Sequence, residues 1–259
     1  MLFIYLDALY NYNIYFSFKK KQNDFSLPNI NLHNKIVKPK DASSIIVLKR
    51  NKGKVMVLMG RRPLTAKFMP GVYVFPGGAV EKDDFKIGKY YNLTSKLSKS
   101  KDKASSTNHS IAIQLAAIRE TAEETGLFLG KRQTIIEPAI FPKNNIWLPF
   151  YNQSLNPEIF KLIFLGRAIT PSFMKIRFHA RFYIAFFEDF VGNINSNGEL
   201  EKLDWFNIRE VKHLNVADVT EFMIDEIISA EENFENFLKN YKHPMFTWRN
   251  KKRWVKWEK

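Results

Sequence analysis

The stretch from Arg119 to Leu127, Arg-Glu-Thr-Ala-Glu-Glu-Thr-Gly-Leu, most constrains what this chain can fold into. Its carboxylates at Glu120, Glu123 and Glu124 are spaced i, i+3 and i+4, so on an α-helix they share one face. Like charges that close repel one another unless a counter-charge is present. Hard divalent cations favour oxygen ligands, and Mg²⁺ is commonly held by a few carboxylates together with substrate phosphates. The stretch therefore predicts a helix with a metal-binding face; the plain alternative is a solvated acidic surface.

The opposite side of the same segment is apolar. Ile111, Leu115, Ile118 and Ala122 recur at helical spacing and lie opposite the glutamates. Gly126 suits the position just past the C-terminal end of a helix. One face of this helix is expected to pack and the other to present acid. The candidates for its N-terminal cap are Thr107, Asn108 and Ser110.

A glycine turn followed by acidic residues lies upstream, in Phe-Pro-Gly-Gly-Ala-Val-Glu-Lys-Asp-Asp from Phe75 to Asp84. Glycine permits backbone angles that other residues avoid, so this turn can bring backbone close to a site; Gly-Gly alone would equally suit an ordinary turn. Together the two pieces resemble the Nudix hydrolase signature, G-x5-E-x7-R-E-U-x-E-E-x-G-U, with U aliphatic. Gly78 would be its first glycine, and the later positions from Arg119 to Leu127 are filled with one exception.

The match to this signature departs from the family pattern in three places. Asp84 stands where Glu is usual, and Thr121 stands where an aliphatic residue is usual. The gap before Arg119 is far longer than seven residues, so residues 85–108 are interpreted as an insertion inside the box. Their Lys- and Ser-rich composition predicts a surface loop.

The insertion narrows the resemblance, because a split box is typical of the branch that contains the peroxisomal coenzyme A diphosphatases and their bacterial relatives. Two further stretches are similar to that branch. Residues 61–78 contain Arg-Arg-Pro and then Phe-Met-Pro-Gly-Val-Tyr-Val-Phe-Pro-Gly-Gly, and residues 170–183 contain Thr-Pro and then Arg-Phe-His-Ala-Arg-Phe-Tyr. His179 and Ala180 replace the Asp and Thr of the branch, on the side expected to meet substrate. The resemblance covers residues 40–225.

The resemblance implies an α/β fold in which a mixed β-sheet is sandwiched between α-helices. It also implies metal-dependent hydrolysis of a phosphoanhydride bond, with Glu120, Glu123 and Glu124 holding Mg²⁺ or Mn²⁺ and Glu123 taking the proton of the attacking water. Arg119 would pair with a glutamate and hold the carboxylates in place. The residues expected to contact substrate are Arg61, Arg62, Lys67, Gly77 and Gly78.

For this branch the substrate would be coenzyme A or an acyl-CoA, giving 3′-phosphoadenosine 5′-phosphate and an (acyl-)4′-phosphopantetheine. Two alternatives stay open. One is a Nudix hydrolase that cleaves NADH, ADP-ribose or RNA 5′ ends. The other is a non-catalytic RNA-binding protein on a Nudix scaffold, against which the intact Arg-Glu-x-x-Glu-Glu argues. Glu199 is a further acid that could reach a metal, although such a residue is more often on the surface.

Composition limits the partners. The chain has no cysteine, which excludes disulfides and thiolate metal sites. Its formal net charge of +14 favours a polyanionic small molecule such as a nucleotide, although the Lys-, Asn- and Ile-rich composition is itself typical of AT-rich coding. No stable nucleic-acid partner is expected, and the oligomeric state is left open. The C-terminal Trp-Glu-Lys differs from the peroxisomal tripeptide, so we expect a cytoplasmic, bacterial enzyme.

The chain is expected to divide into three parts. Residues 1–40 are an N-terminal extension and linker, 41–241 the Nudix domain, and 242–259 a basic aromatic tail that we expect to pack on the domain. Residues 1–16 are apolar but too short and too interrupted to span a membrane, and membrane contact by them is the less favoured reading. Expected strands are 44–48, 55–59, 72–75, 178–187 and 203–206; expected helices are 157–164 and 216–241, besides the acidic helix.

Overall fold

The computed structural model describes residues 37–90, 102–132, 146–230, 237, 241–250 and 252–258. Four parts of the expectations fall outside these residues: the apolar segment 1–16 with the linker up to 36, the middle of the insertion (91–101), segment 133–145, and the helix expected beyond Ala230. Within the described residues, no helix is both long and apolar enough to span a bilayer.

Nine strands of the described chain form one mixed sheet, in the order β11-β10-β7-β8-β1-β2-β3, with β4 paired to β1 and β9 to β2. Strands β1 and β8 are parallel, as are β10 and β7, and the other pairs are antiparallel. The strands are β1 (Lys40–Asn51), β2 (Lys54–Arg61), β3 (Tyr73–Val74), β4 (Gly77–Ala79), β7 (Ile163–Ile169), β8 (Phe178–Phe186), β9 (Glu201–Asn207), β10 (His243–Arg249) and β11 (Lys252–Glu258). A separate pair consists of β5 (Gly130–Arg132) and β6 (Leu155–Pro157).

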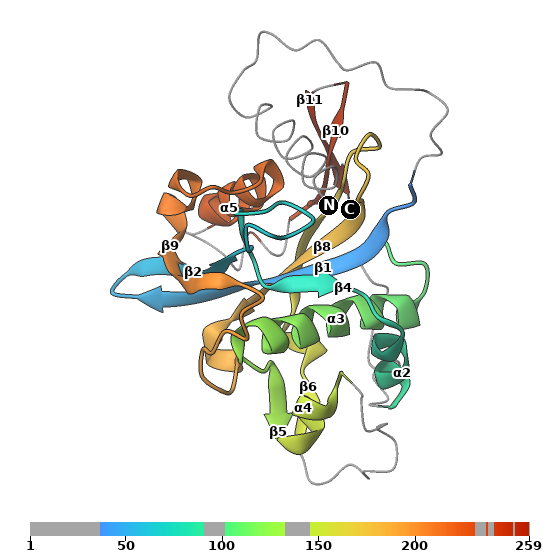
Figure 1. The fold of residues 1–259 in the computed structure, drawn as a ribbon, viewed down its shortest axis with the longest axis vertical. Helices are drawn as coiled ribbons and strands as arrows, with labels where there is room; N and C mark the ends of the chain where they lie inside the picture. Colours follow the sequence, from blue (N-terminus) through green and yellow to red (C-terminus); the bar gives the residue numbers. More distant parts are fainter. Residues whose placement is uncertain are drawn as a thin grey trace.

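Helices cover both faces of this sheet (Figure 1). They are α2 (Lys82–Tyr90), α3 (Thr107–Thr125), α4 (Leu148–Asn152) and α5 (Asp218–Ala230), with 3-10 turns η3 (Ile159–Lys161), η4 (Phe187–Asp189) and η5 (Ile208–His213). Strand β1 shows why there are two cores, since alternate side chains of a strand point to opposite faces. Ile45 and Val47 join the core that contains α3, whereas Ile46 and Leu48 join the core that contains α5. The expected α/β sandwich is confirmed.

Strand β4 carries the glycine turn to the acidic helix. It pairs antiparallel with β1, so that Ser44 lies opposite Gly77 and Ser43 opposite Gly78. Helix α3 packs against both strands. The hydroxyl of Ser43 donates to the carbonyl of Ile113 on α3 at 2.6 Å, a fully buried link between strand and helix. Two pieces of the signature that are 41 positions apart, between Gly78 and Arg119, are brought together by this pairing.

Helix α3 is more enclosed than its sequence predicts. The four apolar residues expected to pack are buried, but so are small and polar residues on the other flanks, including Ser110, Ala116 and Thr121. The helix ends as expected at Gly126, which has a left-handed φ of 72° and donates its N–H to the carbonyl of Ala122. The expected N-cap was wrong by one residue: Ser106 caps the helix by accepting from the N–H of His109 at 3.1 Å.

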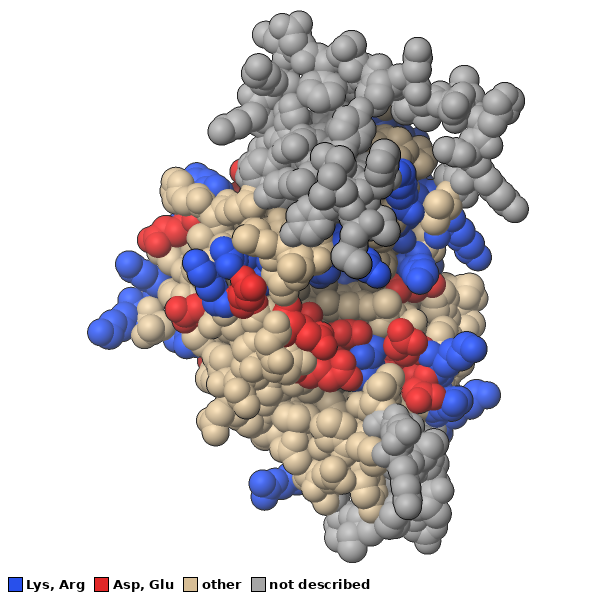
Figure 2. Space-filling model, viewed as in Figure 1, with Lys and Arg blue, Asp and Glu red and all other residues tan. Residues whose placement is uncertain are grey.

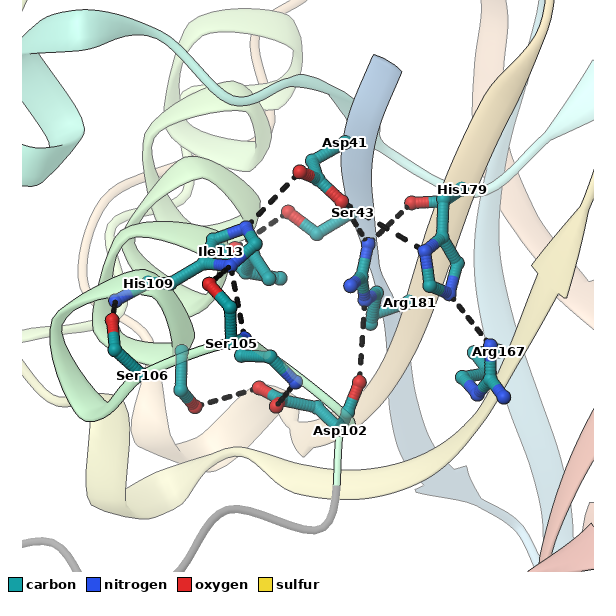
Figure 3. Close-up of polar contacts among 12 residues, drawn as sticks. Asp41, Ser43, Asp102, Ser105, Ser106, His109, Ile113, Arg167, His179 and Arg181 are labelled. Carbon is teal, nitrogen blue, oxygen red and sulfur yellow. Dashed lines mark hydrogen bonds and ion pairs between the residues drawn. The ribbon is translucent and has the colours of Figure 1, made fainter. Parts of the chain in front are cut away.

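A buried polar network supports the N-terminal end of α3 (Figure 3). The carboxylate of Asp102, near the C-terminal end of the insertion, accepts from Ser110 Oγ at 2.6 Å and from Tyr183 Oη at 3.0 Å. Arg181 of β8 donates to the carbonyl of Asp102 at 3.4 Å and to the carboxylate of Asp41 on β1. The returning end of the insertion is thereby attached to the centre of the sheet.

Ser105, His109 and Asp41 in this network resemble a Ser-His-Asp relay in outline (Figure 3). His109 Nδ1 lies 2.9 Å from Ser105 Oγ, and His109 Nε2 lies 3.0 Å from Asp41 Oδ2. However, the N–H of Ser105 also donates to His109 Nδ1 at 3.2 Å. The third helical residue thus reaches back to the backbone before the cap, as in a capping box. These contacts are accounted for by the start of the helix.

Two sequence expectations about elements are corrected. Residues 85–90 of the insertion belong to α2, which buries Ile87, so this part is not a loop. The helix expected at 157–164 is absent: η3 covers only three residues there, and β7 begins at Ile163 because this segment enters the sheet. Residues 243–258 form the last two strands of the sheet, where Arg167 of β7 holds Glu258 through two bonds of 2.9 Å.

Candidate active site

The three glutamates of α3 lie on one side of the helix, and Figure 2 shows acidic side chains gathered over this helix on one face of the molecule. Their exposure differs. The side chain of Glu123 is 30% exposed and that of Glu120 is 15% exposed. Glu124 is buried. Glu123 is therefore the most accessible of the three to a substrate and to water.

Arg119 is the hub of the site, and it is buried. Its Nε and one terminal nitrogen donate to the two oxygens of Asp84 at 3.0 and 3.1 Å. That terminal nitrogen also donates to the carbonyl of Ala79 at 3.0 Å. The other terminal nitrogen donates to Glu120 at 2.8 Å and to Glu123 at 3.2 Å. These five bonds match the five donors of a guanidinium, so Arg119 is committed to holding carboxylates.

Asp84 fills the position where the signature has Glu, and the structure shows what it does there. It is completely buried and forms the bidentate pair with Arg119. Its oxygens also accept from the N–H of Glu81 at 2.8 Å and from the indole of Trp147 at 3.0 Å. The departure from Glu to Asp therefore keeps the buried acid that anchors Arg119. Thr121, the other departure, is buried and donates to the carbonyl of Ala117 one turn earlier, which satisfies its hydroxyl within the helix.

The two glycines meet the glutamates through their backbone. The N–H of Gly77 donates to Glu124 Oε2 at 2.9 Å. A Cβ on Gly78 would collide with the carboxyl group of Glu120. Gly77 has a φ of 154°, which favours glycine, and a Cβ there would collide with the backbone of β1. The turn thus needs glycine at both positions to approach α3 this closely.

Burial of these acids raises their pKa values. Burial raises the pKa of Glu120 to about 7, and the nearby Arg119 only partly offsets this. Burial raises the pKa of Glu124 to about 8, against the hydrogen bond from Gly77. The pKa of Glu123 is also raised by burial. Conversely, burial alone would lower the pKa of Arg119, but Asp84 and the two glutamates outweigh it and keep the guanidinium charged.

The chemistry of this donor set fits a divalent cation. Each of the three glutamates accepts the hydrogen bonds described above on one oxygen, and among the described residues nothing donates to its second oxygen. Carboxylate oxygens are the ligands that Mg²⁺ and Mn²⁺ prefer. In the part of the chain that is described, no three such side chains already converge on one point at metal-binding geometry. The oxygens are of the right kind and on one face, and a cation would draw them together.

The basic residues expected at the substrate are in three different situations. Arg61 is paired with Glu201 of β9. Lys67 is exposed. Arg62 is the one brought to the acids: its Nε donates to the carbonyl of Phe68 at 2.8 Å. Burial lowers its pKa, while the charges of Glu124 and Glu199 act to raise it.

Glu199 lies close enough to the glutamates of α3 for its charge to affect their pKa values. Its charge contributes to the raised pKa of both Glu123 and Glu124. It is exposed, on the turn before β9. The sequence suggested this residue only as a further acid, because nothing in its neighbourhood matches a motif. Trp147 was missed altogether, since it lies in a stretch with no recognisable pattern.

The segment that resembles the Arg-Phe-x-x-Arg-Phe part of the branch lies on β8. Arg181 is fully buried and bound to Asp41, so it supports the fold. His179 Nε2 accepts a hydrogen bond from Arg167 at 2.9 Å, and His179 Nδ1 lies 3.9 Å from Asp41 Oδ1 (Figure 3). At these positions Arg181 and His179 connect neighbouring strands through polar contacts.

The mixed sheet between helices and the acidic helix beside the glycine turn are features of the Nudix fold, and comparison with known structures agrees with this assignment. No family model matches the chain. A crystal structure of a NUDIX hydrolase from Alicyclobacillus acidocaldarius matches with a TM-score of 0.61 and 21% identity, covering 78% of this chain and 96% of that one. The chain therefore has the Nudix fold.

The curated Caenorhabditis elegans protein "Putative nudix hydrolase 7" is 26% identical over 178 residues. The match covers 66% of this chain and 52% of the relative, so the chain spans about half the length of that protein. This similarity and the arrangement of the acidic helix agree with the Nudix fold.

Proposed function

We propose that the chain hydrolyses a phosphoanhydride bond in a nucleoside diphosphate derivative, with coenzyme A or an acyl-CoA as substrate and Mg²⁺ or Mn²⁺ as cofactor. The observation that carries the chemistry is the arrangement around Arg119. One buried guanidinium, fixed on Asp84, holds Glu120 and Glu123 on the exposed side of α3. In an ordinary solvated acidic face the carboxylates are bound by water. Here a buried arginine instead donates all its N–H groups to carboxylates and one carbonyl.

The residues have distinct roles in this proposal. Glu120, Glu123 and Glu124 hold the cation, which would neutralise the diphosphate and lower the pKa of a bound water. Glu123, the most exposed of the three, takes the proton from the attacking water. Gly77 fixes Glu124 through its N–H, and Gly78 leaves room for Glu120.

Basic residues would meet the substrate's phosphates. Arg62 is the best placed, because it lies within the electrostatic reach of Glu124 and is held by the carbonyl of Phe68. Lys67 is exposed and can turn towards an anion. Arg61 would have to leave Glu201 to do so, and we assign it a lesser role. Guanidinium groups match phosphate oxygens in geometry as well as charge.

The assignment to coenzyme A rests on the split box and on the stretch from Arg61 to Gly78, which are similar to the diphosphatase branch. The test is product analysis with Mg²⁺ or Mn²⁺ and a panel of CoA, acyl-CoAs, NADH, ADP-ribose and capped RNA. Formation of 3′-phosphoadenosine 5′-phosphate from CoA supports the proposal. Cleavage of another member of the panel in preference to CoA leaves the chemistry in place and overturns the substrate. No turnover with either metal overturns both.

A further inference from the structure

Trp147 is a residue outside the box that touches its central ion pair. It directly precedes α4 and is completely buried. Its indole Nε1 donates to Asp84 Oδ1 at 3.0 Å. It also packs against Phe150, with ring centroids 5.0 Å apart. A buried indole N–H needs a hydrogen-bond acceptor. The acceptor of Trp147 is Asp84, the acid that anchors Arg119.

The bond from Trp147 completes the hydrogen bonding of Asp84. Each oxygen of this carboxylate accepts two bonds: Oδ1 from Arg119 Nε and Trp147, and Oδ2 from Arg119 and the N–H of Glu81. Four bonds match the capacity of a carboxylate. These four bonds therefore fix the orientation of the carboxylate, which the ion pair with Arg119 alone would leave less constrained.

The side chain of Asp84 is one methylene shorter than the Glu of the signature. A shorter acid reaches less far, so its orientation depends more on the other groups that bind its oxygens, and Trp147 donates to the same oxygen as Arg119 Nε. Trp147 comes from a different part of the chain, and its rigid indole ring donates to Asp84. Asp84 and Trp147 are both completely buried.

We propose that Trp147 is a positioning residue for the acidic helix. Through Asp84 it holds Arg119, and through Arg119 it holds Glu120 and Glu123 where they bind the cation. The inference rests on the proposed metal-dependent function and names a residue that no part of the signature covers. Groups of this kind, behind the ligands, commonly change metal affinity or activity by about 10- to 100-fold when they are removed.

The test compares Trp147→Phe with Phe150→Leu. Both variants remove aromatic volume from the same buried cluster, but only the first removes the donor to Asp84. Mn²⁺ affinity is measured from the electron paramagnetic resonance signal of free Mn²⁺, and the unfolding midpoint is measured beside it. We expect both variants to lose stability, and Trp147→Phe alone to weaken Mn²⁺ binding, by about tenfold. Equal Mn²⁺ affinities in the two variants overturn the inference.

A double-mutant cycle of Asp84→Glu and Trp147→Phe measures the coupling between the two side chains directly. Asp84→Glu places a longer acid against the indole in a site without spare room. We expect Asp84→Glu to weaken Mn²⁺ binding in the wild-type background, and less so when Trp147 is replaced by the smaller Phe. Strictly additive effects in this double-mutant cycle contradict the inference, because they show that the two side chains do not act as a unit.

Failure of the inference is distinguishable from failure of the proposed function. If the wild-type protein binds Mn²⁺ and cleaves nothing in the panel, the proposed hydrolysis fails, and the comparison of Mn²⁺ affinities still decides the role of Trp147. If the wild type cleaves a substrate and Trp147→Phe matches Phe150→Leu in Mn²⁺ affinity and kcat, the function stands and the inference fails. If the wild type binds no Mn²⁺, both are overturned.

Discussion

The carboxyl group of Glu120 occupies the space that a side chain at Gly78 would need. This contact, between the first glycine of the signature and a glutamate 42 positions later in the chain, makes the box one unit despite its insertion. Gly78→Ala should therefore displace Glu120 from Arg119. We expect kcat to fall by about 100-fold, the loss typical of a displacement near 1 Å at a catalytic site.

Gly53→Ala is the matched control for that substitution. Gly53 has a positive φ, unlike Gly78, and nothing lies within 4 Å of the position of its Cβ. It should lose about 1 kcal/mol of stability through backbone strain and keep its activity. Steady-state kinetics and thermal unfolding of both variants check this. Full activity in Gly78→Ala would contradict the close packing of turn and helix.

Protons should compete with the cation for the acidic helix. Burial raises the pKa of Glu120 to about 7 and that of Glu124 to about 8 in the metal-free protein, so both carboxyls are largely protonated at pH 6. A carboxyl must lose its proton to bind a metal, and binding therefore releases protons. We expect Mn²⁺ affinity to rise steadily from pH 5.5 to about pH 8 and then to level off.

Calorimetric Mn²⁺ titrations in two buffers of different ionisation enthalpy measure both the affinity and the protons released. The proton release should be largest near pH 6 and vanish above the pKa of Glu124. An affinity that is constant over this range would show that these carboxyls are not the ligands.

His179 should make stability fall in weak acid. Burial, together with the charges of Arg181 and Arg167, lowers its pKa to about 4, whereas an unfolded histidine has a pKa of about 6.5. Between these values the unfolded chain binds the extra proton, so the free energy of unfolding rises with pH through this window and is lost as pH falls from about 6.5 to 4. The full contribution is at most about 3 kcal/mol, since each pKa unit corresponds to about 1.4 kcal/mol.

Urea unfolding of His179→Gln between pH 4 and pH 7 checks this expectation. The variant should lose part of the pH dependence, while the lowered pKa of Asp41 in the same network still contributes. The exposed His213 provides the control, and His213→Gln should keep the wild-type slope. Identical slopes in all three proteins would mean that His179 is not held neutral.

The acidic helix and the glycine turn could be predicted from the sequence because their spacing is local. Three glutamates within five residues must share a helix face, and Gly126 ends the helix where the pattern stops. The hairpin of β1 and β2 was also correctly expected, since a short turn connects two β-branched runs. The Nudix resemblance supplied the rest of the fold class.

The contacts that complete the site could not be predicted, because they cross long stretches of chain. The bond from Trp147 to Asp84 spans 63 positions, and that from Arg181 to Asp41 spans 140. Neither residue lies in a periodic pattern that indicates its partner. The failed helix at residues 157–164 has a similar cause: pairing of β7 with β8 and β10 overrides a local helical pattern.

The measurement that tests the central claim most directly is the kcat of Glu123→Gln on the preferred substrate of the panel. Glu188→Gln, the same chemical change at an exposed position on η4, is the control. With Glu123 as the base on a folded metal site, kcat should fall by about 10²- to 10⁴-fold in the first variant and stay at the wild-type value in the second. A Glu123→Gln variant that is correctly folded and turns over at the wild-type rate would contradict the account of the acidic helix as the catalytic centre.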